Sequence, residues 1–369
     1  MTFDTNYKPP VYPGARLGTL RQDGTIGAND QWLRKWELTV VSSGEIGRAG
    51  AGVTITTQEE HHDFRMTFRV RAADGAQTSP TAEIRVYNLS KETARHIIRE
   101  HDRVILQAGY VTGHYGIIFT GRIKYFKVGR ESAVDAYLDI FAASADELND
   151  AWFNKSIEGP IRDPAQVEKD ELKRVANEHV KMLEDGDQAP PSAKVTQLLP
   201  RDLVLYGGWK SELREWERST FSTFHVQNDK LQILPRTAYN RGDIVVINAG
   251  TGMVGVPEVT TDGINLQCLL NPNLYVKGRV KLDNRTFNTY YVPGGNLLAG
   301  QPGAQAGTAR VGLGAFMAPI TEDGVYTIIS IDHSGDTRGQ AWYSHLMCTH
   351  QHPDRVWDQS VTAGDWRPT

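Results

Sequence analysis

The sequence predicts a mainly β protein, in which two antiparallel β regions related by duplication flank a small α+β insert. Three observations carry this prediction. Apolar and polar residues alternate through most of the first and last thirds of the chain. Helical periodicity is concentrated in the middle third. Four segments of the first third also recur, in the same order, in the last third.

Length and composition limit the possible classes of protein. The chain has 369 residues, more than one typical core accommodates, so two or three domains are expected. The formal net charge is −4 and no block of like charge occurs, which argues against non-specific nucleic-acid binding. No specific nucleic-acid binding is expected either. No signal peptide and no apolar run of membrane-spanning length is visible, so we expect a soluble protein without a membrane anchor.

Composition shifts along the chain predict its division into five parts. These are an extended arm (1–35), a first β barrel with one helix (36–150), an α+β insert (151–242), a second β barrel with a Gly-rich insertion at 285–323 (243–350), and a C-terminal tail (351–369). Each β region has enough strands to close a small barrel, which would remove exposed strand edges.

The first β region shows the clearest alternation. The segment 64–72 predicts a half-buried strand with one apolar and one polar face. Its apolar face carries Phe64, Met66, Phe68 and Val70, and its polar face carries Arg65, Thr67, Arg69 and Arg71. A second strand at 82–89 leads to Ser90, a helix N-cap with acidic Glu92 in the first turn. Strands are expected at 103–110, 116–128 and 133–143.

The middle third predicts two helices and a hairpin. Asp163 and Pro164 form a strong helix start, and Gly186 is the expected end. A second helix is expected at 211–221. The following segment alternates around Asn228-Asp229, which predicts a β-hairpin turn.

The recurring segments indicate an internal duplication. The pairs are 81–89 with 262–271, 102–110 with 276–284, 116–129 with 324–336, and 132–143 with 339–350. The first copy has a helix where the second has only Pro272-Asn273, and the second carries the Gly-rich insertion. The alternative is that antiparallel strands look alike because alternation and turn residues recur in all of them.

Several phrases are similar to one known family. They are VYNLSKET at the strand-to-helix step, NDKLQILP at the end of the insert, and MVGVPE followed by GIN and LLNP. Over about 36–350 the chain resembles the baseplate hub proteins of contractile-tailed bacteriophages. This family has a duplicated, tail-tube-like barrel and is related to the hub part of contractile secretion spikes.

The resemblance implies two tandem tail-tube-like antiparallel β barrels and a structural role without an enzyme activity or a cofactor. It implies a homotrimer whose six barrels present pseudo-six-fold symmetry. The implied partners are the tail tube or a tube-initiator protein, the central spike and other baseplate proteins. The implied location is the virion, after assembly in the host cytoplasm, and DNA can pass through such a ring.

Two other functions stay open at this point. Cys348, His350 and His352 share a face if their strand continues, and a thiol with two imidazoles suits zinc, as in a metal-dependent hydrolase on a β-rich scaffold. No fourth ligand is evident and Pro353 stops the strand, so we expect no metal and a buried free thiol at Cys348, as at Cys268. A hub component of a contractile secretion apparatus is the other alternative, expected to continue into a β-helical needle.

The tail predicts a contact with another chain. Trp357 and Trp366 lie in a polar, Pro-ended segment where a large aromatic side chain has little core to join. Aromatic residues of this kind often anchor in a pocket of a partner. We therefore expect both to contact a partner chain.

Overall fold

The computed structural model describes most of the chain between residues 31 and 350. The described residues are 31, 33–42, 52–56, 64–75, 79–111, 113–179, 181–182, 198–220, 222–235, 238–240, 242–260, 263–282 and 324–350.

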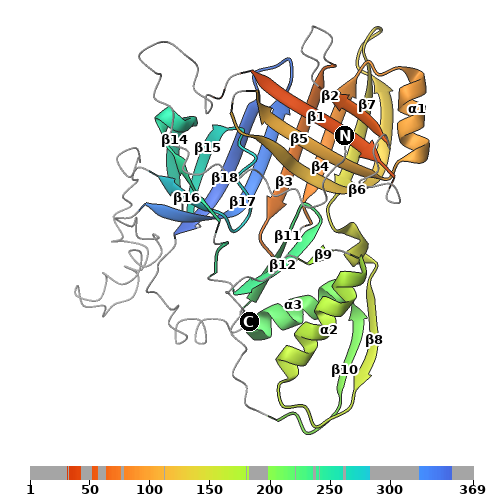
Figure 1. Cartoon of the computed structure of the whole chain (residues 1–369), viewed down its shortest axis with the longest axis vertical. Helices are drawn as coiled ribbons and strands as arrows, with labels where there is room; N and C mark the ends of the chain where they lie inside the picture. Colours follow the sequence, from red (N-terminus) through yellow and green to blue (C-terminus); the bar gives the residue numbers. More distant parts are fainter. Residues whose placement is uncertain are drawn as a thin grey trace, which may run out of the picture.

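The elements follow the predicted order of β region, α+β insert and β region (Figure 1). The first group is β1 (Arg34–Val41), β2 (Val53–Thr56), β3 (Met66–Ala73), β4 (Thr81–Tyr87), α1 (Lys91–Glu100), β5 (Arg103–Tyr110), β6 (Tyr115–Arg130) and β7 (Ala136–Ala143). The second is η2 (Asp146–Asn149), β8 (Trp152–Ile157), α2 (Pro164–His179), β9 (Lys181–Met182), β10 (Leu203–Gly208), α3 (Trp209–Thr220), β11 (Ser222–Gln227) and β12 (Lys230–Pro235). The third is β13 (Ile244–Ile247), η3 (Ala249–Thr251), β14 (Met253–Thr260), β15 (Gly263–Leu269), β16 (Arg279–Leu282), β17 (Val325–Asp336) and β18 (Trp342–His350).

Local sequence signals account for the helix starts and the hairpin. The Ser90 hydroxyl accepts a hydrogen bond from the amide of Thr93 at 3.0 Å, which caps α1. The Asp163 carboxylate accepts one from the amide of Gln166 at 3.1 Å at the start of α2, but this helix ends at His179, before the expected Gly186. The β11–β12 hairpin turns at Asn228-Asp229 as predicted.

The two β regions have the same strand order. In the first region the neighbours run β3-β4-β7-β6-β5-β1, and in the second they run β14-β15-β18-β17-β16-β13. Both copies carry a β-bulge at the same place, between Ile123 and Tyr125 in β6 and between Ile328 and Ser330 in β17. The ladder register beside it also matches, since Arg103 pairs with Arg122 as Arg279 pairs with Thr327. This correspondence supports the predicted duplication.

One pairing joins the two regions into a single sheet of 13 strands. The far half of β17 pairs antiparallel with β3, from Ser330 opposite Ala73 to Asp336 opposite Thr67. The predicted mainly β fold is confirmed. No closed barrel is found among the described strands, because β3 pairs with β17 of the other region and does not close its own region.

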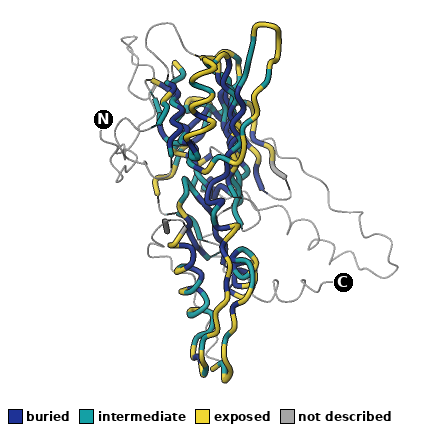
Figure 2. Tube along the Cα trace, turned by 90° about the vertical axis from the view of Figure 1, so that its right-hand side faces the viewer, coloured by how far each residue is buried: buried dark blue, intermediate teal, exposed yellow. Residues whose placement is uncertain are grey.

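Buried residues lie in both the large sheet and the insert (Figure 2). The buried apolar residues form three clusters. One lies under the first β region, one between the helices and strands of the insert, and one under the second β region. The first cluster also contains Leu270 and Trp342, which belong to the second region in sequence. Packing therefore crosses the join, and the five-part division of the chain stays a prediction.

Candidate interaction surface

The joined sheet presents one polar face that crosses from the second β region to the first. Alternation places Met66, Phe68 and Val70 of β3 against the core, so that Arg69 and Arg71 point away from it. The neighbouring strands β17, β4 and β7 follow the same rule. Half-solvated antiparallel sheets of this kind separate an apolar from a polar face.

Ion pairs connect this polar face across the join between β3 and β17. The guanidinium of Arg69 donates to the carboxylate of Asp332, with a shortest distance of 2.6 Å, and that of Arg65 donates to Asp336 at 3.0 Å. Burial works to raise the pKa of Asp336, but the hydrogen bonds from Arg65 and from backbone amides outweigh it, and the pKa is lowered. Each pair bridges two residues more than 260 positions apart.

The same pattern continues over the first region. Arg85 on β4 binds Asp139 on β7 at 2.6 Å and lies over the ring of Tyr137 at 4.0 Å from its centroid. Arg71 pairs with Glu83 at 2.7 Å. Because arginines and carboxylates alternate across the strands, this face is hydrophilic and close to neutral in charge.

The join itself is tightly packed around an aromatic pair. Trp342 of β18 meets Phe68 of β3 edge to face at 5.3 Å, and its indole N–H donates to the carbonyl of Gly109 at 3.3 Å. A Cβ on Gly335 would lie 2.4 Å from the Phe68 ring, so this position on β17 needs glycine. Arg34 of β1 donates to the carbonyls of the β17–β18 turn.

A buried polar cluster ties the insert to both β regions. The ammonium of Lys277 lies 2.8 Å from the carboxylate of Asp74, and the hydroxyl of Thr223 donates to the same carboxylate at 2.9 Å. These three residues come from the second β region, the first β region and the insert. Nearby His225 is buried, and burial lowers the pKa of its imidazole to about 4. The cluster therefore fixes three parts of the chain to one another.

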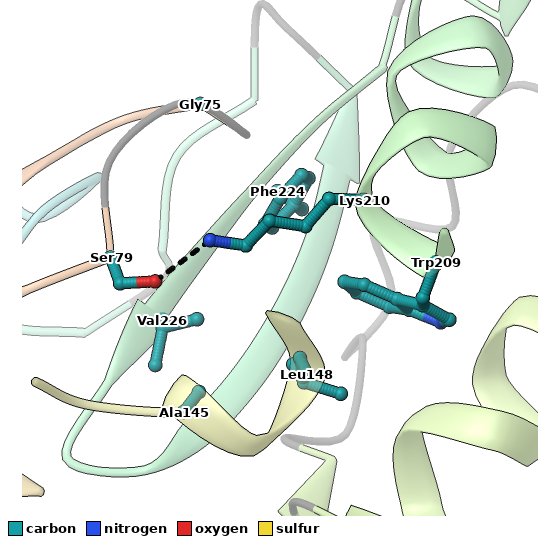
Figure 3. A pocket seen from close by; sticks show the side chains of 8 residues that line it. All are labelled: Gly75, Ser79, Ala145, Leu148, Trp209, Lys210, Phe224 and Val226. Carbon is teal, nitrogen blue, oxygen red and sulfur yellow. Dashed lines mark hydrogen bonds between the residues drawn. The ribbon is translucent and has the colours of Figure 1, made fainter. Parts of the chain in front are cut away.

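A small pocket lies between the insert and the first β region (Figure 3). It is lined by Gly75, Ser79, Ala145, Leu148, Trp209, Lys210, Phe224 and Val226. Lys210 donates to the hydroxyl of Ser79 at 3.0 Å, and burial lowers the pKa of its ammonium. The cavity measures about 10 Å³, room for about one water molecule. A serine beside a lysine could suit nucleophilic catalysis, but this pocket is too small to admit a substrate.

The structure describes only part of the predicted zinc group. Cys348 is fully buried in the core under the second β region, and burial raises the pKa of its thiol, which disfavours the thiolate that zinc binds. The side chain of His350 and all of His352 lie outside the described residues. Within the part of the chain that the structure describes, no group of three or more His, Cys, Asp or Glu side chains is placed to hold a metal.

Several other predicted features also lie outside the described residues. They are Trp357 and Trp366, the tail at 351–369, the Gly-rich insertion at 285–323 and nearly all of the arm at 1–35. The predicted partner contacts of the two tryptophans stay predictions.

Sequence reasoning missed the partners of the polar face. Alternation identified Arg65, Arg69 and Arg71 as outward-facing, but no local signal pointed to Asp332 or Asp336 as their partners. The one available signal is the sign of charge on each strand: the polar face of 64–72 carries arginines, and 324–336 carries aspartates. Opposite charges of this kind are compatible with pairing but do not identify it.

No family model and no curated protein matches the sequence. Among solved structures, a chain of the Francisella PdpA–VgrG complex is similar over 87% of this chain and 59% of that chain, with 5% identity and a TM-score of 0.50. A tail protein from Neisseria meningitidis MC58 is similar over 86% of this chain and 97% of that chain (8% identity, TM-score 0.48). The E. coli c3393 protein, a component of the type VI secretion system, is similar over 80% of this chain and 76% of that chain (12% identity, TM-score 0.45).

The likeness to the chain of the PdpA–VgrG complex shows a shared fold. No helix of the described residues is both long and apolar enough to cross a membrane.

Proposed function

We propose that this chain is the structural hub of a phage baseplate, a homotrimeric ring with pseudo-six-fold symmetry that joins a hexameric tail tube to a trimeric central spike. The observation that carries the proposal is the repeated strand order of the two β regions and their union into one sheet through β3 and β17. Three copies would present six similar β regions to a six-fold partner and three inserts to a three-fold one.

The fold shared with a chain of the PdpA–VgrG complex supports this proposal, as do the phrases that resemble phage hubs.

The test measures the molar mass of the purified chain in solution by light scattering. Class averages from negative-stain images of the same fraction show whether it forms rings. We expect three chains of 41.1 kDa, about 123 kDa in all, and ring views with pseudo-six-fold features. If the free chain is monomeric, the measurement is repeated with a trimeric spike protein added. A chain that stays monomeric in both conditions contradicts the proposal.

Metal analysis of the same fraction tests the hydrolase alternative. Stoichiometric zinc that is lost in a Cys348→Ser variant would favour an enzyme using Cys348, His350 and His352. The hub proposal expects no stoichiometric zinc.

A further inference from the structure

The duplicated strand order assigns a counterpart to every strand at the join. Since β17 matches β6 and β3 matches β14, the β17–β3 join within the chain corresponds to a pairing between β6 and β14. In the sheet β14 is a terminal strand, whereas β6 lies between β7 and β5, and the two strands do not pair within the chain. Both have an edge to offer. Among the described residues, β14 pairs only with β15, and β6 beyond Arg122 pairs only with β7.

We propose that the open edge of β6 in one copy of the chain pairs antiparallel with the open edge of β14 in the next copy, repeating between chains the join made within the chain. This inference deepens the proposed function, because it names the contact that would build the ring. A contact that uses one edge from each copy is head-to-tail, and such contacts close into rings when the rotation permits.

Matching the bulges and ladders transfers the register from one join to the other. Lys127 on β6 takes the place of Asp332 on β17, and Val128 takes the place of His333. On the other side, Glu258 on β14 takes the place of Arg69 on β3. Position 259 then corresponds to Val70 and lies opposite Val128, as Val70 lies opposite His333.

The charges at the matched positions are complementary. Within the chain, Asp332 pairs with Arg69 across the join. Between chains, the same two positions are filled by Lys127 and Glu258, so the signs are exchanged and the attraction is retained. Both side chains are exposed in the single chain. Because like charges would repel across a strand pair, the sign match favours this pairing.

The exposure of the matched residues His333 and Val128 also fits the proposed pairing, because the residue on the covered edge is buried and the residue on the open edge is exposed. His333, covered by β3, is 3% exposed, whereas its counterpart Val128 is 63% exposed. A valine on an open strand edge presents apolar surface together with unpaired backbone groups. A paired strand from the next copy would cover both.

The edge of β14 has one feature that sets the length of the contact. A β-bulge lies between Val254 and Glu258, where Pro257 offers no amide donor. The transferable ladder is therefore limited to Glu258–Thr260 opposite Lys127–Gly129. Bulges, prolines and lysines also protect free edges from pairing, and that protective role is the competing explanation.

The test places cysteines at the two positions that the register sets opposite each other. Val128→Cys and Val259→Cys chains are mixed and oxidised with copper phenanthroline, because directly opposed positions lie within disulfide reach. Unsubstituted chain reports the background from the buried Cys268 and Cys348. The matched control mixes Val204→Cys, 64% exposed on the insert, with Val259→Cys.

We expect the 128–259 mixture to give a cross-linked dimer and the control mixture to give none above background. A chain that carries both substitutions should give trimers. Equal yields in the two mixtures overturn the proposal, whatever the mass of the free chain. A 123 kDa trimer without the 128–259 cross-link would be consistent with the hub proposal but would reject this pairing. A selective cross-link from a chain that does not form a trimer would support the pairing but contradict the hub proposal.

Charge reversal gives a second test, which measures the concentration needed for assembly. If the lysine and the bulge only protect free edges, reversing these charges should not change that concentration. Lys127→Glu should raise the concentration for half-assembly about tenfold, as should Glu258→Lys. The double variant Lys127→Glu/Glu258→Lys should restore assembly. Lys91→Glu, an exposed reversal on α1, is the matched control and should leave assembly unchanged. Failure of the double variant to recover would contradict the pairing of these two side chains.

Discussion

The two β regions share strand order, a bulge and the register of the ladders beside it, although β1 pairs antiparallel with β5 and β13 pairs parallel with β16. Their matching edges have different surroundings. The far half of β17 is covered by β3, so His333 is buried. The far half of β6 pairs with β7 on one edge, but no described strand pairs with its other edge, and Val128 is exposed. The local ladders are alike at both places. The environment of a residue in a duplicated unit is therefore decided by what covers the strand edge, and not by the strand's own hairpin.

The two regions also differ in their elements and in the core residues that each contributes to the other. The first region contains α1, where the second has only a turn at 271–277, and it receives Trp342 and Leu270 from the second region into its core. The first core thus depends on the second region. This dependence makes the join, and not either region alone, the place to test the comparison.

The largest effect is expected from Trp342→Ala. The side chain is 1% exposed and packs on Phe68 inside the core of the other region. Its removal should lower the free energy of unfolding by about 3–5 kcal/mol, measured by urea denaturation. Trp152→Ala is the matched control, because Trp152 is 61% exposed and should cost under about 1 kcal/mol. Equal losses in the two variants would show that Trp342 does not hold the join.

The next effect concerns the buried pair between Asp74 and Lys277. Asp74→Ala leaves the ammonium of Lys277 buried without this partner, and should lower the free energy of unfolding by about 3 kcal/mol. The double variant Asp74→Ala/Lys277→Met should recover part of the loss, because no buried charge remains. A double variant as unstable as the sum of its parts would contradict a role for the pair in fixing the regions together.

Much of the fold was predictable because its signals are local. Alternation predicted the faces of β3, the hydroxyl of Ser90 predicted the start of α1, and Asn228-Asp229 predicted a turn that both residues make with positive φ. The order of four segments predicted a duplication that the strand order now supports. These inferences need only a few neighbouring residues each.

The join and its site were not predictable, because they depend on contacts between distant positions. Nothing near Arg69 in the sequence indicates that Asp332 lies beside it, and nothing near Asp74 indicates Lys277. Closure into barrels was the expected way to remove strand edges. The chain pairs one edge with its other region, an alternative that alternation cannot distinguish from closure.

His333 offers a pH test of the covered edge. Burial lowers the pKa of its imidazole to about 4, from a usual 6.5. Above pH 6.5 the residue is neutral in both states; as the pH falls from 6.5 toward 4, the unfolded chain takes up a proton that the folded chain does not. The free energy of unfolding should therefore fall by about 2–3 kcal/mol over this range through His333.

The measurement is urea denaturation at several pH values between 4 and 7, compared with His333→Gln. The variant loses some stability at pH 7, because the hydrogen bond between the imidazole and Ser344 is changed, but its slope with pH should be smaller. His225→Gln is the matched comparison, since its imidazole also has a pKa of about 4 and lies at the insert. An unchanged slope for His333→Gln would show that the covered edge admits water.

The smallest effect is expected on the polar face. Arg71 and Glu83 form a 2.7 Å ion pair, but both side chains are 49% exposed. Glu83→Gln should change the free energy of unfolding by under about 0.5 kcal/mol, because solvent and salt screen such pairs. Asp332→Asn is the comparison that sharpens the contrast, since this carboxylate is 22% exposed and spans the join to Arg69, so a loss of about 1 kcal/mol is expected. If the two variants lose equal stability, the ion pair between Arg69 and Asp332 contributes no more than an ordinary surface pair. The join is then stabilised by the packing of Trp342 and by the backbone hydrogen bonds between β3 and β17.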